Sequence, residues 1–188
     1  MEIVFIILGC IVVLGIIIAA TYNGLVKTNE RVEEAWSDIT VQLKYRADLI
    51  PNVVETVKGY AKHESETFKM VTSARSAVMG AKTVKETAAA EKDMQSALGR
   101  IFAIAEAYPE LKANENFKTL QVQLQDVEDK IQAARRFYNS GAKELNTKIK
   151  VFPTILINSM FLHFKKRDYF EVEEAEKAKI ANAPEVKF

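Results

Sequence analysis

The sequence predicts an all-α protein in which an N-terminal transmembrane helix precedes an elongated antiparallel bundle of three long helices and a short C-terminal helix. The first observation behind this fold class is the uncharged apolar run Ile3–Ala20. The second is the helical periodicity of apolar residues in three later stretches. The whole chain of 188 residues contains only seven glycines and four prolines, so few residues interrupt helices. We therefore expect an anchor at 1–22, a helical bundle domain at 23–164 and a charged C-terminal tail at 165–188.

The apolar run is long enough to act as a membrane anchor, because about 18 uncharged residues can cross a hydrocarbon core as a helix. A removable signal peptide is the alternative, since Ile18–Ala20 loosely resembles a small-residue cleavage site. We favour a retained anchor for two reasons. Glu2 is the only charged side chain before the run, and the run is longer than the apolar region of an ordinary signal.

Charge and cysteine content narrow the possible partners. The chain has 26 basic and 25 acidic residues and a net charge of +1, so it lacks the basic field expected for a nucleic-acid partner. Cys10 is the only cysteine, which excludes an intrachain disulfide. The segment Ile7–Cys10 resembles a lipoprotein cleavage box, but the apolar run continues beyond it, and we interpret Cys10 as a small apolar residue.

The side of the membrane is predicted from the basic residues near the apolar run. Lys27 and Arg31 follow the run and no basic residue precedes it, so the positive-inside rule favours a cytoplasmic bundle, with an outside domain as the alternative.

The first long helix is predicted from a heptad seam that spans 32–78 and ends at Gly80. Pro51 lies inside this seam and removes one backbone donor, so we expect a kink there, with a full break as the alternative. The seam consists of Val32, Trp36, Ile39, Leu43, Ile50, Val53, Val57, Tyr60, Val71, Ala74 and Val78.

Local signals place the second and third helices. Thr83 followed by Glu86 forms a capping box, which predicts a helix start at Thr83, and Pro109 ends that helix. The third helix carries an apolar stripe from 117 to 145, with Asn114 or Asn116 as its cap. We expect this helix to end at the proline at 153.

The segment 155–164 is more densely apolar than a surface helix requires, but it is too short to span a bilayer. We favour a short helix that closes the open end of the bundle, and contact with lipid or with another subunit is the alternative. The charged stretch 165–188 is predicted to be a solvated helix that frays into a tail.

The sequence offers little for catalysis or metal binding. His63 and His163 are the only histidines, and no serine is flanked by glycines as in a nucleophile elbow. His63 with Glu64 and Glu66 lacks a second histidine one helical turn away, and no glycine-rich loop precedes a helix. We therefore expect no catalytic residue, no metal and no cofactor. An unfamiliar carboxylate site involving Glu64 or Glu106 is the weakest alternative.

Two kinds of side chain are candidates for interactions. Arg46 falls on the apolar seam, where we favour a guanidinium that extends to water, with an ion pair to Asp48, Glu128 or a neighbouring chain as the alternative. Trp36 also lies on the seam, and we favour core packing over a role as an interface anchor. The candidate interaction residues are Trp36, Arg46, Arg135, Arg136, Met160, Phe161 and Phe164.

Arg135 and Arg136 stand next to Tyr138 and Asn139 near the end of the third helix. This pair of guanidinium groups could bind anionic lipid headgroups or a carboxylate of a partner. A solvated charged face is the interpretation that we favour.

Several strings of the chain resemble the LemA family of bacterial membrane proteins. They are Ala35–Ile39, Val41–Lys44, Asp48–Asn52, Glu55–Tyr60, Ala105–Phe117, Ala134–Asn139 and Phe152–Pro153. They follow in order over nearly the whole chain, and only Thr40 and Tyr45 depart from the residue types expected there. The resemblance implies a short N-terminal segment, one transmembrane helix and a long α-helical domain, but no reaction and no catalytic residue.

These observations favour a non-enzymatic scaffold that is held in the bacterial cell membrane by its N-terminal helix and that assembles as a homo-oligomer. The long seams and the apolar segment at 155–164 motivate the assembly, because a three-helix bundle leaves more seam than it can bury. The alternative is an accessory or signalling adaptor subunit of another membrane protein, such as a protease or a sensor. The expected partners are membrane lipids and further copies of the chain, or that other membrane protein.

Overall fold

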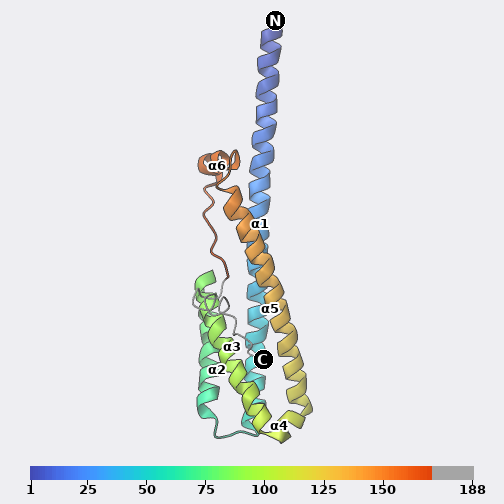
Figure 1. Cartoon of the computed structure of the whole chain (residues 1–188), viewed down its shortest axis with the longest axis vertical. Coiled ribbons are helices and arrows are strands. Elements are labelled where there is room, and N and C mark those ends of the chain that lie inside the picture. The colour runs from blue at the N-terminus through green and yellow to red at the C-terminus, as the bar shows by residue number, and fades with distance from the viewer. Residues whose placement is uncertain (171–188) are drawn as a thin grey trace, which may run out of the picture. The chain divides into compact units, whose positions relative to one another are not determined.

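The computed structural model describes residues 1–170, and every regular element in that range is a helix (Figure 1). The all-α prediction is therefore confirmed. The elements are α1 (Glu2–Lys58), α2 (Ser65–Gly80), α3 (Val84–Ala107), α4 (Pro109–Ala113), α5 (Glu115–Lys148), α6 (Thr154–Ile157) and the π-helix η1 (Asn158–Leu162).

The chain divides into two compact units. The first unit contains residues 1–39 and 133–168, and the second contains residues 40–132 and the described residues 169–170. The long helices α1 and α5 each contribute to both units.

In the first unit, α1 and the C-terminal part of α5 pack closely. A Cβ atom on Gly141 would lie 3.3 Å from Cγ2 of Val32, so the missing side chain permits this close approach. Nearer the exposed apolar segment of α1, Lys148 Nζ donates a hydrogen bond to Thr28 Oγ1 at 2.8 Å. The buried apolar residues of this unit are Leu25, Val32, Ala35, Ile39, Tyr138, Ala142, Leu145, Ile149 and Ile157.

In the second unit, the seam of α1 packs with apolar faces of the other helices, and α2 and α3 lie side by side (Figure 1). Residues predicted from the three periodic stretches are buried here within one chain. They include Leu43, Ile50, Val53, Val57, Val71, Met94, Ile101, Leu124, Val127 and Ile131.

The first predicted helix is two helices, so its length was predicted wrongly. The helix α1 ends at Lys58, a turn occupies residues 59–64, and α2 begins at Ser65. A heptad seam cannot reveal such a turn when both helices direct their apolar faces to the same core. The predicted end at Gly80 is confirmed.

Pro51 does not break α1, which continues to Lys58, so the alternative of a full break is wrong. Because Pro51 has no amide hydrogen, it cannot donate to the carbonyl of Ala47 one turn earlier. Arg75 Nε of α2 donates to that carbonyl instead, at 2.7 Å. A side chain from another helix thus restores the hydrogen bond that the proline removes.

The capping signals are confirmed. Glu86 N donates to Thr83 Oγ1 at 3.2 Å, and Thr83 N donates to Glu86 Oε2 at 3.2 Å. The amides of Lys82 and Thr83 hold the pKa of Glu86 below its ordinary value. Asn114 Oδ1 accepts from Phe117 N at 2.9 Å, which identifies Asn114 as the cap of α5.

Replacing Thr83 with alanine is expected to lower the free energy of unfolding by about 1 kcal/mol, because the amide of Glu86 loses its acceptor at the start of α3. Urea unfolding of the full chain in detergent, followed by circular dichroism, measures the change. Thr119→Ala is the control, since the Thr119 hydroxyl is exposed within α5 and bonds only to the Glu115 carbonyl. Equal midpoints for the two variants would contradict the capping role.

The end of the described chain differs from the prediction. α5 ends at Lys148, and α6 and η1 are followed by non-helical residues from His163, whose φ is 55°. The helix predicted from 165 onward is therefore wrong for 165–170. The predicted fraying tail at 171–188 lies outside the described residues.

Candidate functional site

Arg46 is the most deeply buried charged residue of the second unit, with 1% of its surface exposed. It lies on α1 between Leu43 and Ile50 of the buried seam, so the prediction that its guanidinium reaches water is wrong. Arg46 Nη1 donates to Glu91 Oε1 at 2.6 Å, and Nη2 pairs with the other oxygen of the same carboxylate. Nη1 also donates to Glu128 Oε2 at 3.0 Å.

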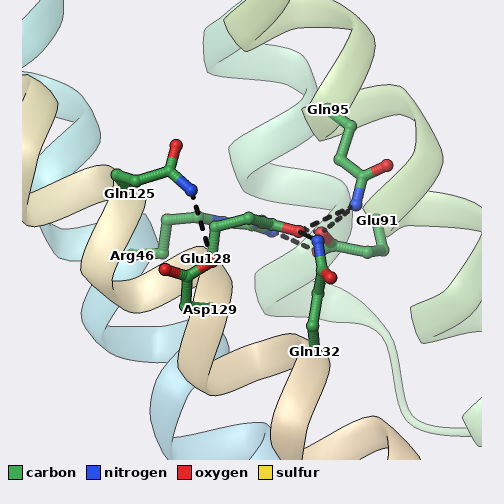
Figure 2. A network of polar contacts seen from close by, with 7 residues as sticks. All are labelled: Arg46, Glu91, Gln95, Gln125, Glu128, Asp129 and Gln132. Atoms are coloured by element: carbon green, nitrogen blue, oxygen red, sulfur yellow. Dashed lines mark hydrogen bonds and ion pairs between the residues drawn. The ribbon is translucent and has the colours of Figure 1, made fainter.

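The surrounding amides complete a cluster that joins α1, α3 and α5 (Figure 2). Gln95 Nε2 lies 3.4 Å from Glu91 Oε1 and 3.3 Å from Glu128 Oε1. Gln132 Nε2 donates to Glu128 Oε1 at 3.1 Å. We call the group Arg46, Glu91, Glu128, Gln95 and Gln132 the arginine cluster. The pairing with Glu128 agrees with one predicted alternative, whereas Glu91 was not predicted.

The arginine cluster can fix how three helices pack, because both terminal nitrogens of the Arg46 guanidinium bind carboxylates of other helices. The bidentate pair with Glu91 is almost fully desolvated, while Glu128 is 22% exposed. Among residues 1–170, Arg46 Nε is a buried polar atom without a hydrogen-bond partner. Burying these charges is costly unless they remain paired, so we expect the pairing to favour one helix register more than it adds stability.

A different set of polar contacts holds residues 163–168 of the first unit against its helices. The Asn146 side chain accepts from Arg167 N at 2.8 Å and donates to Arg167 O at 2.9 Å. Tyr138 Oη donates to Asp168 O at 2.8 Å, and Arg167 bonds Asn29 and Glu33 of α1. We call residues 163–168 the strap. Burial raises the pKa of Tyr138 above its ordinary value.

Trp36 packs on Tyr138 within the first unit. The ring centroids are 5.6 Å apart and the planes are inclined by 55°. Trp36 is half-buried, so the indole contributes to the intrachain packing that we favoured. Its role as an interface anchor stays a prediction.

The two arginines of α5 are placed differently. Arg135 is half-buried and Arg136 is exposed. Binding of lipid headgroups or of a partner carboxylate by these residues stays a prediction.

The apolar segment after α5 does not close the end of the bundle as we expected, because most of its large side chains are exposed. Met160 is 67% exposed and Phe161 is 56% exposed, whereas Phe164 is half-buried. Only Ile157 of this segment is buried. We define the apolar tip as Val151, Phe152, Ile155, Leu156, Met160 and Phe161, which are 42–78% exposed.

Within residues 1–170, no group of three or more His, Cys, Asp or Glu side chains is placed to hold a metal ion. An open groove of about 550 Å³ lies in the second unit. Lys58 Nζ lies 5.9 Å from the ring of Phe68 at this groove. The groove is lined by Lys58, Ser65, Phe68, Lys69, Thr72, Ser73 and Ser76.

Sequence reasoning missed two residues that organise these contacts. Glu91 lies three residues after Ala88 and three before Met94 on the apolar stripe of the second stretch, so a carboxylate on that stripe was the available signal. Asn146 gave no comparable signal, because its partner is backbone 21 residues away.

A family profile and individual relatives both indicate the family to which this chain is similar. The LemA family profile matches residues 35–188. The magnetosome protein MamQ of Magnetospirillum gryphiswaldense is 26% identical over 180 residues, which cover 82% of this chain and 66% of MamQ. Magnetosome protein MamQ 1 of Paramagnetospirillum magneticum is 24% identical over the same shares of both chains. The chain thus spans slightly less than two thirds of the length of these relatives.

Protein LemA of Metamycoplasma hominis is 30% identical over 155 residues, which cover 80% of this chain and 70% of that protein. This agreement and the match of the family profile extend over most of the chain and include the helices that carry the arginine cluster. The chain belongs to the LemA family.

Proposed function

We propose that this LemA-family chain is a non-enzymatic scaffold that α1 anchors in a bacterial membrane and that assembles laterally with further copies. The observation that carries the proposal is the continuity of α1. One helix begins in the exposed apolar segment and continues to Lys58, and its residues Ile50, Val53 and Val57 are buried in the second unit. A helix without an interruption couples an anchor to a folded domain more firmly than a flexible linker does.

The exposure of the apolar segment supports the anchor. Its most apolar window has a mean hydropathy of 3.3, and none of that window is buried in the fold. The core helix of a soluble protein would be mostly buried instead. A removable signal would share this exposure, so the mass of the protein extracted from membranes distinguishes the two: a retained anchor keeps residues 1–20.

The arrangement of the buried charges supports a structural role. Arg46 is enclosed by Glu91 and Glu128 of its own chain, which is an arrangement that holds helices together. A catalytic group would need access to a substrate.

Most residues of the predicted seams are buried within one chain, so the seams offer little surface for assembly and another surface is required. Val41 and Tyr45 offer such a surface, because they lie one helical turn apart on α1 with exposed fractions of 57% and 46%. Large exposed apolar side chains at helical spacing are suited to contact between helices. We assign the lateral contact to this face of α1.

Cysteine crosslinking in native membranes tests the assembly. In a Cys10→Ala background, Val41→Cys is expected to form disulfide-linked dimers, whereas Lys62→Cys, exposed in the turn before α2, is expected to form few. Monomers only, or equal crosslinking at both positions, would contradict assembly through α1. A different protein recovered with the chain in a fixed ratio would favour the adaptor.

The same Lys62→Cys protein reports the side of the membrane. We propose that the helical domain is cytoplasmic, because Lys27 and Arg31 follow the apolar segment. A thiol reagent that cannot cross membranes is then expected to label this cysteine only after the cells are opened. Labelling of intact cells would place the domain outside.

A further inference from the structure

The apolar tip belongs to the first unit, as does the exposed apolar segment of α1 that we propose as the anchor. The last residue of α5, Lys148, bonds Thr28 of α1, and the chain then continues toward the N-terminal end of α1 (Figure 1). Only about 12 Å of helix separates Thr28 from Ala20, the last residue of the apolar run. The headgroup layer on one side of a bilayer is about 5–8 Å thick. The tip is therefore within reach of that layer.

Polar contacts keep the tip folded while its large side chains face outward. Asn158 Oδ1 accepts from Phe164 N at 2.9 Å, and Asn158 Nδ2 donates to Phe164 O at 3.1 Å. The strap then fixes the following residues through Asn146 and Arg167. The exposed apolar side chains are consequently held by the fold before any partner binds.

The charges beside the tip favour an anionic surface. The interval between Glu144 and Asp168 contains no acidic residue. Two of its basic residues pair within the unit, Lys148 with Glu144 and Arg167 with Glu33. The exposed basic residues that flank the tip are Lys150, Lys165 and Lys166.

A second copy of the chain fits this surface poorly. A twofold contact places the same patch of both chains together, so the lysines of one tip would face the lysines of the other. A lipid surface instead offers apolar chains for Phe152 and Phe161 and phosphate groups for the lysines. Large apolar side chains next to basic residues are the composition of segments that lie in the membrane interface.

We propose that the apolar tip inserts into the interfacial layer of the membrane that α1 crosses and forms a second, anionic-lipid-dependent attachment. Phe152, Leu156 and Phe161 enter the boundary between headgroups and acyl chains, and the flanking lysines contact lipid phosphates. The proposal rests on the anchor proposed above. It adds a specific lipid class and a site that holds the first unit against the bilayer.

Fluorescence quenching by brominated lipids tests the tip in the full chain. A Trp36→Phe background removes the only tryptophan, and Phe161→Trp then places a reporter in the tip. Phe137→Trp is the matched control, because Phe137 is also an exposed aromatic residue, 58% exposed, but lies on α5. The proteins are reconstituted in vesicles of phosphatidylglycerol and phosphatidylcholine, with brominated acyl chains.

Strong quenching at position 161 and weak quenching at 137 are expected. Equal weak quenching in protein that floats with the vesicles would overturn the tip proposal and leave the anchor intact. Failure to float would instead overturn the anchor. A blue-shifted but unquenched emission at 161 would show that protein covers the tip, which also overturns lipid insertion.

The lipid class is tested by replacing Lys150, Lys165 and Lys166 together with glutamine in the Phe161→Trp protein. Each lysine is expected to change the ratio of inserted to free tips about fivefold on anionic vesicles. The same protein on phosphatidylcholine alone should respond little to the substitutions. Equal quenching of the parent and the triple variant on anionic vesicles would overturn the dependence on anionic lipid.

Discussion

Arg46→Met is expected to lower the free energy of unfolding by about 3–5 kcal/mol, because it leaves the nearly buried carboxylate of Glu91 without its bidentate partner. Methionine has a similar length and fills most of the same space, so the loss arises mainly from the uncompensated charge. Glu128 is less affected, because it is partly exposed and keeps its contacts with Gln95 and Gln132. Urea unfolding in detergent measures the change.

Two further variants separate the charge from the packing. Arg46→Met with Glu91→Leu removes both desolvated partners and is expected to recover most of the lost stability, since apolar replacements of a buried pair are often neutral or stabilising. Arg136→Met is the control at an exposed arginine and is expected to change the free energy by less than about 0.5 kcal/mol. If the double variant were less stable than Arg46→Met, the assigned penalty would be wrong.

Ile11→Arg combined with Leu14→Arg is expected to release the protein from membranes. The two side chains lie on one face of the exposed apolar segment, and each arginine near the centre of a transmembrane helix costs about 3 kcal/mol. Together they oppose most of the insertion energy of a segment of this length. Carbonate washing of membranes, followed by quantification of the chain in the pellet and the supernatant, measures the effect.

The matched control exchanges apolar residues at the same positions, as Ile11→Leu with Leu14→Ile, and is expected to stay in the membrane pellet. Circular dichroism should show that the released arginine variant keeps its helical domain. Retention of that variant in washed membranes would contradict the assignment of residues 2–20 as the principal anchor.

The sequence was informative wherever the determining interaction is local. Thr83 and Glu86 are three residues apart, so the spacing alone predicted the start of α3. Asn114 caps α5 through an amide three residues later, and the apolar stripes identified the buried faces. The resemblance to the LemA family rested on short strings and was confirmed by a match over residues 35–188.

The sequence was uninformative where the partner is distant. Arg46 and Glu91 are separated by 45 residues, and nothing in either neighbourhood showed which carboxylate the guanidinium would meet. The strap is non-helical, and Asn146 binds the backbone of its Arg167 from 21 residues away, although the composition of the strap suits a solvated helix. The turn at 59–64 could not be predicted, because the apolar residues before and after it pack into the same core and keep the same heptad spacing.

The hydrogen bond from Arg75 to the Ala47 carbonyl means that α2 supports α1 at the turn that contains Pro51. Without that guanidinium, Pro51 would leave a carbonyl unsatisfied inside a long helix, at a point where bending is easiest. A contact from α2 thus satisfies the carbonyl at this point of α1, and the contact exists only while α2 remains docked. Undocking of α2 would convert the same proline from a tolerated residue into a hinge.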